Sequence, residues 1–302
     1  MTVDTTAVPV TLADDWAAEY RGVVIGSPGS PLTFTEISGL LDAPALRTAD
    51  RATLNRHGEV SGRDYLGPRT VVITLELNAR DSGEFADQLD AVTAAFAPAQ
   101  PVAPFRFRFP GVAGGGVRLV NAKVRKRAIT IDTAYTHHYA TVTVELYCPS
   151  PLILDVAKST GYARLPNLNG VGGGIRFPIR FPVRFGRSVS TPTIVARNSG
   201  TFDTYPTFRI RGPIADPRIV NVGTGEQLEF RYVLLRGQWL DVNTDTRDVL
   251  LNGSAPRFLT PGLRNTWLSI PPGVSEFGLR GFRLPDETVE PELTGDWYSA
   301  WV

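Results

Sequence analysis

The stretch TVVITLEL, residues 70–77, decides the fold class, because apolar side chains recur at every second position. In an extended strand these positions share one face, while the residues between them face the other way. The stretch YATVTVELY, residues 139–147, has the same period. Both segments are therefore predicted to be half-buried β-strands. The residues on the two apolar faces are Val71, Ile73, Leu75, Leu77, Ala140, Val142, Val144 and Leu146.

Other short apolar segments with strand periodicity follow one another between turn residues, so most of the chain is expected to be β. The chain has 302 residues, of which 42% are hydrophobic. That length accommodates two ordinary domains, and this composition is typical of folded proteins with a sizeable core.

One segment has helical periodicity, DSGEFADQLDAVTAAF at residues 81–96. Asp81 and Glu84 resemble a capping box, in which side chains accept hydrogen bonds from the first free amides of a helix. Pro98 and Pro101 follow and end the segment. A helix near residues 82–96 is predicted to pack across a sheet of the first domain. Its apolar stripe is Phe85, Leu89, Val92 and Phe96.

Composition divides the chain into three parts. Residues 1–155 hold the strands and helix above and are expected to form an N-terminal β domain. Residues 156–190 are rich in Gly, Pro and Arg, which is typical of a linker or an extended arm. Residues 191–302 are again β-rich and have the length of a small sandwich.

The arm contains IRFPIRFPVRFGRS, residues 175–188, where arginine and phenylalanine recur. Two prolines exclude a helix, and the odd positions from 175 to 185 are all apolar. This alternation predicts an edge strand or extended arm with one apolar face and one arginine face. We favour a contact between subunits or domains over nucleic-acid binding, because the chain lacks a basic excess. The candidate interface residues are Arg176, Phe177, Arg180, Phe181, Arg184 and Phe185.

Charge supports that preference, since 31 basic and 30 acidic residues give a formal net charge of +1. A local basic cluster, Lys123 with residues 125–127, is interpreted as a solvated strand face. Contact of this cluster with passing DNA or an acidic partner is the alternative. The sequence has no apolar stretch long enough to span a membrane as a helix, and no membrane partner is expected.

The residues that most often bind metals are sparse. Cys148 is the single cysteine, so an intrachain disulfide and a cysteine-based zinc site are both excluded. His137 and His138 are adjacent in a predicted strand, where they would point to opposite faces and could not share a metal. Residues 241–252 begin like a calcium loop but have Thr246 at the glycine position, and a strand–turn–strand reading fits better. No metal or cofactor is therefore predicted.

Catalytic motifs are not evident. The glycine runs lack the Lys-Ser/Thr of a phosphate-binding loop, and no Gly-x-Ser-x-Gly elbow occurs. A carboxylate pair fixed in space could still support a hydrolase, which spacing alone does not exclude. Tryptophans in the second β unit favour a core or subunit contact, with sugar stacking as the alternative. These are Trp239, Trp267, Trp297 and Trp301.

The order of motifs resembles the distal tail proteins of phages with long, flexible, non-contractile tails. In the first domain the resemblance rests on residues 37–50 and 56–77, and in the second on residues 198–212, 242–253 and 268–281. The ending DWYSAWV is similar to tail proteins from phages of actinobacterial hosts. The residues that carry the resemblance are Gly39, Leu40, Pro44, Arg47, Asp50, Gly58, Gly62, Arg69, Asn198, Gly200, Thr204, Pro206 and Gly212.

The resemblance implies a β-barrel-like or split-barrel first domain with one packed helix, and a galectin-like C-terminal sandwich. It implies a structural virion protein without catalysis, assembled as a hexameric ring at the tail tip around a DNA channel. One face of the ring would join the tail tube protein, and the other would receive tail-associated and fibre proteins.

Three other readings stay open. The first is a carbohydrate-binding adhesin module of a tail or cell surface, and the second is a hydrolase on a β scaffold. The third is a related ring protein of a contractile injection device.

Overall fold

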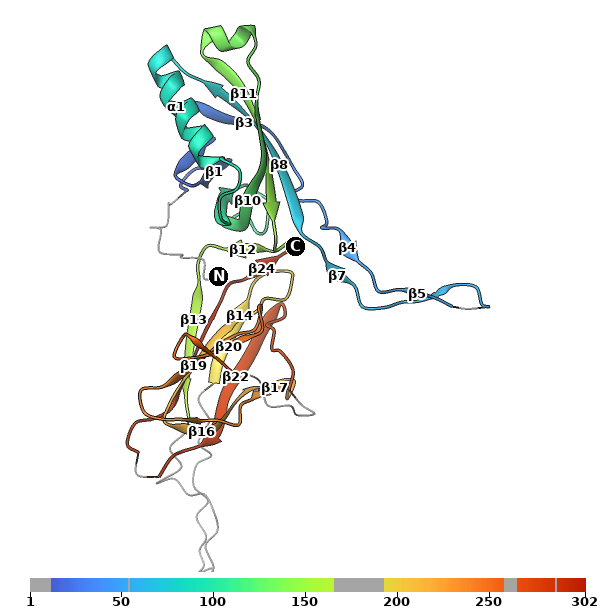
Figure 1. The fold of residues 1–302 in the computed structure, drawn as a ribbon, viewed down its shortest axis with the longest axis vertical. Helices are drawn as coiled ribbons and strands as arrows, with labels where there is room; N and C mark the ends of the chain where they lie inside the picture. Colours follow the sequence, from blue (N-terminus) through green and yellow to red (C-terminus); the bar gives the residue numbers. More distant parts are fainter. Residues whose placement is uncertain (1–11, 54, 166–192, 258–264, 286) are drawn as a thin grey trace, which may run out of the picture. The chain divides into compact units, whose positions relative to one another are not determined.

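The computed structural model describes the chain apart from residues 1–11, 54, 166–192, 258–264 and 286 (Figure 1). The chain forms two compact units, one of residues 1–156 with 301–302 and the other of residues 157–300. Strands dominate both units, and α1 (Ser82–Ala95) is the one α-helix among the described residues. The predicted mostly β fold with a single packed helix is therefore confirmed.

The first unit is built on one strongly bent sheet with the main strand order β2-β1-β9-β10-β11-β8-β3. Long strand β10 is shared, pairing with β9 through its first half and with β11 through its second. The order begins at β2 and ends at β3, so the described strands form an open, split arrangement rather than a closed barrel. The strands are β1 (Ala17–Tyr20), β2 (Val23–Ile25), β3 (Leu32–Ser38), β8 (Arg69–Asn78), β9 (Ala103–Arg108), β10 (Arg118–Ile129), β11 (Tyr139–Cys148), β12 (Ile153–Asp155) and β24 (Ala300–Trp301).

The two stretches that predicted the fold class are neighbours at the centre of this sheet. Strands β8 and β11 pair antiparallel over their full lengths, from Tyr139 opposite Asn78 to Cys148 opposite Arg69. Burial alternates along both strands, as period-two patterning requires. Each large apolar side chain buried there contributes about 1.5–3 kcal/mol relative to an exposed one.

Helix α1 begins where the sequence predicts. The Asp81 carboxylate accepts a hydrogen bond from the Glu84 amide at 2.8 Å, which satisfies one of the free amides of the first turn. Glu84 accepts hydrogen bonds from Arg80, and this lowers the pKa of Glu84 to about 2. Phe85 and Val92 are buried on the stripe, and Phe96 just past the helix stacks on Tyr20 at 5.2 Å.

Cys148 ends β11 in the core of the first unit, fully buried. Burial raises the pKa of this thiol to about 11, so the reactive thiolate is scarce at neutral and mildly alkaline pH. We expect iodoacetamide to leave the native protein unmodified and to alkylate one site per chain after denaturation, as read by intact mass. Rapid alkylation of the native protein would contradict this buried position.

The second unit is a sandwich of two antiparallel sheets. The six-stranded sheet has the order β13-β23-β15-β19-β20-β21, and the five-stranded sheet has β14-β22-β16-β17 with β18 beside β16. Phe208 and Phe277 meet edge to face between the sheets at 5.2 Å. The strands are β13 (Ser159–Arg164), β14 (Thr193–Asn198), β15 (Thr207–Arg211), β16 (Ile214–Asn221), β17 (Gln227–Glu229), β18 (Val233–Leu234), β19 (Trp239–Asn243), β20 (Asp248–Leu251), β21 (Ala255–Pro256), β22 (Gly273–Phe282) and β23 (Glu292–Trp297).

Two findings extend the domain division drawn from composition. Strand β13 pairs with β23 in the six-stranded sheet, although the composition of residues 156–190 predicts a linker or arm. Trp301, expected in the second β unit, belongs to the core of the first. Its ring lies under the Arg118 guanidinium, 4.2 Å from the ring centroid.

Candidate interaction surfaces

A two-stranded ribbon, residues 41–68, projects from the sheet of the first unit (Figure 1). It is built from β4 (Leu46–Arg47) paired with β7 (Tyr65–Leu66), and from β5 (Arg51–Ala52) paired with β6 (Glu59–Val60). The two backbones run close together: a Cβ on Gly62 would lie 2.3 Å from the Ala49 carbonyl oxygen. The ribbon therefore depends on glycine at this crossing.

Most of the ribbon's described side chains are exposed, including large apolar ones. An isolated two-stranded ribbon is marginally stable in water, and exposed apolar groups are typical of surfaces that meet another molecule. The ribbon is thus the clearest candidate interaction surface of the first unit. Its exposed apolar side chains are Leu41 (74% exposed), Leu46 (58%), Val60 (63%) and Tyr65 (51%).

A buried arginine holds the base of the ribbon. Arg69 is 2% exposed, and its guanidinium donates hydrogen bonds to the carbonyl oxygens of Gly39, Leu40, Asp42 and Pro151, at 2.7–3.0 Å. Burial lowers the pKa of Arg69, although a guanidinium stays charged at neutral pH. Gly39 has φ +80°, and a Cβ there would lie 2.0 Å from the Thr70 carbonyl oxygen. These contacts fix where the chain leaves the sheet.

A groove of about 730 Å³ lies beside β3, the last strand in the sheet order. Its lining includes Trp16, Phe34 and Phe109, and Leu41 at the start of the ribbon. Trp16 is 62% exposed, which is unusual for the largest apolar side chain. The groove and the ribbon base therefore form one continuous, partly apolar surface.

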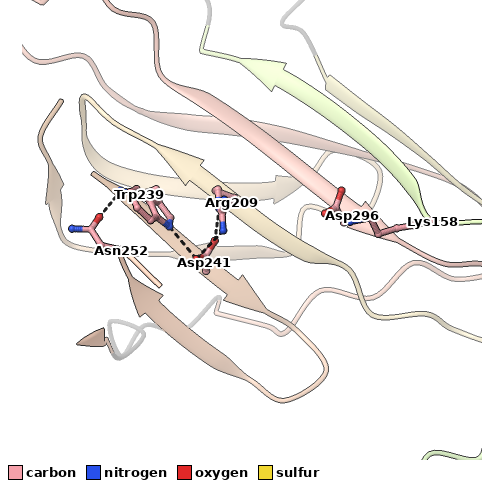
Figure 2. Close-up of polar contacts among 6 residues, drawn as sticks. All are labelled: Lys158, Arg209, Trp239, Asp241, Asn252 and Asp296. Carbon is pink, nitrogen blue, oxygen red and sulfur yellow. Dashed lines mark hydrogen bonds and ion pairs between the residues drawn. The ribbon is translucent and has the colours of Figure 1, made fainter. Parts of the chain in front are cut away.

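In the second unit, a polar cluster lies on the outer face of the six-stranded sheet (Figure 2). The Asp241 carboxylate accepts hydrogen bonds from Arg209 Nε at 2.6 Å and from the Trp239 indole nitrogen at 3.0 Å. Lys158, just before β13, pairs with Asp296 on β23 at 3.0 Å. The charged groups of this face are thus partly tied into pairs, and the Trp239 ring is held in one orientation.

The interface residues predicted from the arm, Arg176, Phe177, Arg180, Phe181, Arg184 and Phe185, lie outside the described residues. Their role stays a prediction.

The basic cluster on β10 is only partly free. The Arg125 guanidinium lies over the Tyr147 ring at 3.6 Å, and Arg127 donates a hydrogen bond to the Thr93 carbonyl oxygen at the end of α1. These contacts give both arginines a structural role in the first unit. Contact with DNA or an acidic partner stays a prediction.

The strand predicted for the paired histidines is wrong. His137 ends the 3-10 helix η1 (Thr133–His137), and His138 caps it in the left-handed region at φ 60°. The Asp132 side chain accepts hydrogen bonds from the amides of Ala134 and Tyr135, which favours a helical turn over a strand. The described residues include no group of three or more His, Cys, Asp or Glu side chains arranged to hold a metal.

The predicted hairpin and the tryptophans of the second unit lie as follows. Residues 239–251 form the β19–β20 hairpin, as the strand–turn–strand reading predicts. Trp297 is buried in the second core and Trp267 packs against it, in agreement with the core reading. Trp239 is half-buried on the sheet surface. In the described part of the chain, no helix is both long and apolar enough to cross a membrane.

The family comparison concerns the second unit. Residues 199–284 match the model of the siphovirus-type tail component, C-terminal domain. They include four positions that carried the resemblance in the sequence, Gly200, Thr204, Pro206 and Gly212. A search of curated proteins found no significant match.

Three solved structures resemble the chain. The crystal structure of SPP1 Dit (gp 19.1), described as a paradigm of the hub adsorption apparatus in phages infecting Gram-positive bacteria, has a TM-score of 0.59 at 12% identity. The match covers 95% of this chain and 99% of that one. The phage P2 baseplate in its activated conformation with Ca gives a TM-score of 0.47 at 10% identity, over 93% of this chain and 97% of that one. The phage p2 baseplate in its activated conformation with Sr gives a TM-score of 0.44 at 10% identity, over 92% of this chain and 96% of that one.

The two kinds of comparison agree. The family match rests on sequence and covers part of the second unit, whereas the SPP1 Dit match rests on the fold of almost the whole chain. Together they confirm the resemblance to siphovirus tail components. Residues 199–284 thus match the siphovirus-type tail component C-terminal domain, and the chain as a whole is similar in fold to the SPP1 Dit protein.

Proposed function

We propose that this chain is a structural virion protein at the distal end of a long non-contractile phage tail. Six copies form a ring around a channel through which DNA passes. The siphovirus-type C-terminal domain supports placement in the tail, and the fold shared with a hub protein supports the distal position. Catalysis is not part of this proposal.

The observation that carries the ring proposal is the exposed ribbon, residues 41–68. A ring requires a heterologous interface, in which one surface of each subunit meets a different surface of the next. The ribbon supplies the first surface, because its apolar side chains have no core of their own. The second surface in this proposal is the groove beside β3, which ends the sheet order of the described strands and whose edge could accept added strands.

The partners follow from the same position. One face of the ring joins the tail tube protein, and the other receives tail-associated and fibre proteins. The arm at residues 175–185 adds a further subunit or domain contact through its phenylalanine face and its three arginines. The basic cluster on β10 contacts passing DNA transiently.

Assembly can be tested by shortening the ribbon. Leu46 and Leu66 are cross-strand partners, so two glycines can replace residues 47–65 as a hairpin turn. We expect the full chain to form a six-membered ring, alone or with purified tail tube protein, by light scattering and negative-stain imaging. The shortened variant should stay monomeric, because it loses Val60, Tyr65 and most of the length of the ribbon.

A folding control on the shortened variant separates an effect on assembly from an effect on folding. The variant should keep the circular dichroism spectrum and unfolding midpoint of the parent, since the ribbon contributes little to either core. A variant that still forms rings would remove the ribbon from the interface. A full chain that stays monomeric even with the tube protein would contradict the ring itself. A variant with Arg176, Arg180 and Arg184 all replaced by glutamate tests the arm. If this variant still forms rings, those three arginines have no role in the interface.

A further inference from the structure

The second unit has a groove of about 510 Å³ at one end of the six-stranded sheet. Its lining comes from strands β15, β19 and β23, from the turn before β19 and from the segment before β23. The side chains that give it its chemical character are Arg209, Arg211, Arg236, Trp239, Glu290 and Glu292.

Three of these side chains form a row across the sheet. Arg211 is the direct cross-strand partner of Glu292 on one side and of Trp239 on the other. Neighbouring strands lie about 4.8 Å apart, and side chains opposite one another point to the same face. A carboxylate, a guanidinium and an indole ring therefore stand side by side on the solvent face of the sandwich.

The charged groups of the groove are available to a ligand. Within the described part of the chain, Arg211, Arg236, Glu290 and Glu292 form no ion pair with each other or with another residue. The groove thus offers both planar donors and planar acceptors with their hydrogen-bonding edges free.

The aromatic group, in contrast, is held in place. Asp241 accepts the indole hydrogen bond of Trp239 and is itself paired with Arg209 (Figure 2). The Arg209 guanidinium carbon lies 5.6 Å from the indole ring centroid. An aromatic side chain fixed in this way can bind a ligand without losing further conformational freedom.

We propose that this groove binds a saccharide. The C–H face of a pyranose ring packs on Trp239, while vicinal hydroxyls donate to Glu292 and accept from Arg211. Two unpaired carboxylates disfavour a nucleic-acid phosphate backbone, which they would repel. The free charges equally disfavour a wholly apolar ligand, because burying them without partners is costly.

The inference can be tested on the full chain labelled with 5-fluorotryptophan. The probes are defined oligosaccharides of neutral hexoses, N-acetylhexosamines, deoxyhexoses and uronic acids, followed by fluorine NMR. We expect at least one probe to shift the Trp239 signal, assigned from Trp239→Phe, in a saturable titration. Arg211→Ala should weaken binding at least about tenfold, as read from the same signal. Trp239→Ala lacks that signal, so its binding is read from the proton signals of the oligosaccharide, and it should weaken by a similar factor.

Matched controls lie on the other sheet of the sandwich. Phe282→Ala removes an aromatic side chain that is 63% exposed, and Arg197→Ala removes an exposed arginine. Both should leave binding unchanged. The proposal is overturned if no probe binds, if Trp239→Ala and Arg211→Ala bind as well as the parent, or if the groove takes a peptide or oligonucleotide but no saccharide. Ring assembly is measured separately, so the two proposals can fail independently.

Discussion

Replacing Arg69 with methionine should lower the free energy of unfolding of the first unit by about 3 kcal/mol. The guanidinium donates to four backbone carbonyls that lie on two distant segments, residues 39–42 and Pro151. Methionine fills part of the volume but donates nothing, so these buried acceptors lose their partner. Methionine is neutral and so avoids the cost of burying a charge, but this gain offsets only part of the lost hydrogen bonding.

Hydrogen exchange read by mass spectrometry can locate the effect, because it reports the two units separately. In the Arg69→Met protein, amides of β8 and of the ribbon base should exchange faster, while those of the second unit stay protected. In Arg69→Lys these amides should exchange at rates between those of the parent and of Arg69→Met, since an ammonium cannot reach all four carbonyls. The exposed Arg47→Met is the control and should change stability by less than about 0.5 kcal/mol. Unchanged exchange in Arg69→Met would show that the ribbon base does not depend on the arginine.

The second large effect is expected at Asn198, 2% exposed at the end of β14. Its amide nitrogen donates to the carbonyl oxygens of Phe202 at 2.7 Å and Ile270 at 3.0 Å. Its amide oxygen accepts from the backbone of Gly200 at 2.9 Å and Ala300 at 3.2 Å. Asn198→Leu keeps the size but removes all four bonds, and should destabilise the second unit by about 3 kcal/mol.

Urea unfolding followed by hydrogen exchange measures this loss for the second unit. Arg197→Leu, the exposed neighbour on the same strand, is the control and should stay within about 0.5 kcal/mol of the parent. Asn198→Asp keeps the two acceptor bonds but loses both donors and buries a charge, so it should be no more stable than Asn198→Leu. A stable Asn198→Leu protein would mean that water replaces the lost bonds.

The elements that sequence could predict are those whose pattern is local. Strands β8 and β11 alternate strictly, and α1 combines a capping aspartate with an apolar stripe, so periodicity alone identified them. The β19–β20 hairpin was recognisable because turn residues separate two apolar runs.

The missed features depend on distant partners. The ribbon has no apolar alternation, since it has no core to face, and its signal was only the spacing of Gly58, Gly62 and Gly67. Arg69 is one of the residues that carry the family resemblance, but its four carbonyl partners lie 27–82 positions away. The groove row of Glu292, Arg211 and Trp239 arises from strand pairing, which patterning does not reveal.

Trp301 in the core of the first unit has a consequence for biosynthesis. Residues 1–156 leave the ribosome early, yet their core lacks one of its members until residue 301 has been made. The whole second unit is synthesised in that interval. Domains usually fold in the order of their synthesis. Here the unit that is begun first is completed last, so a nascent chain must hold a partly finished sheet while it folds an entire sandwich.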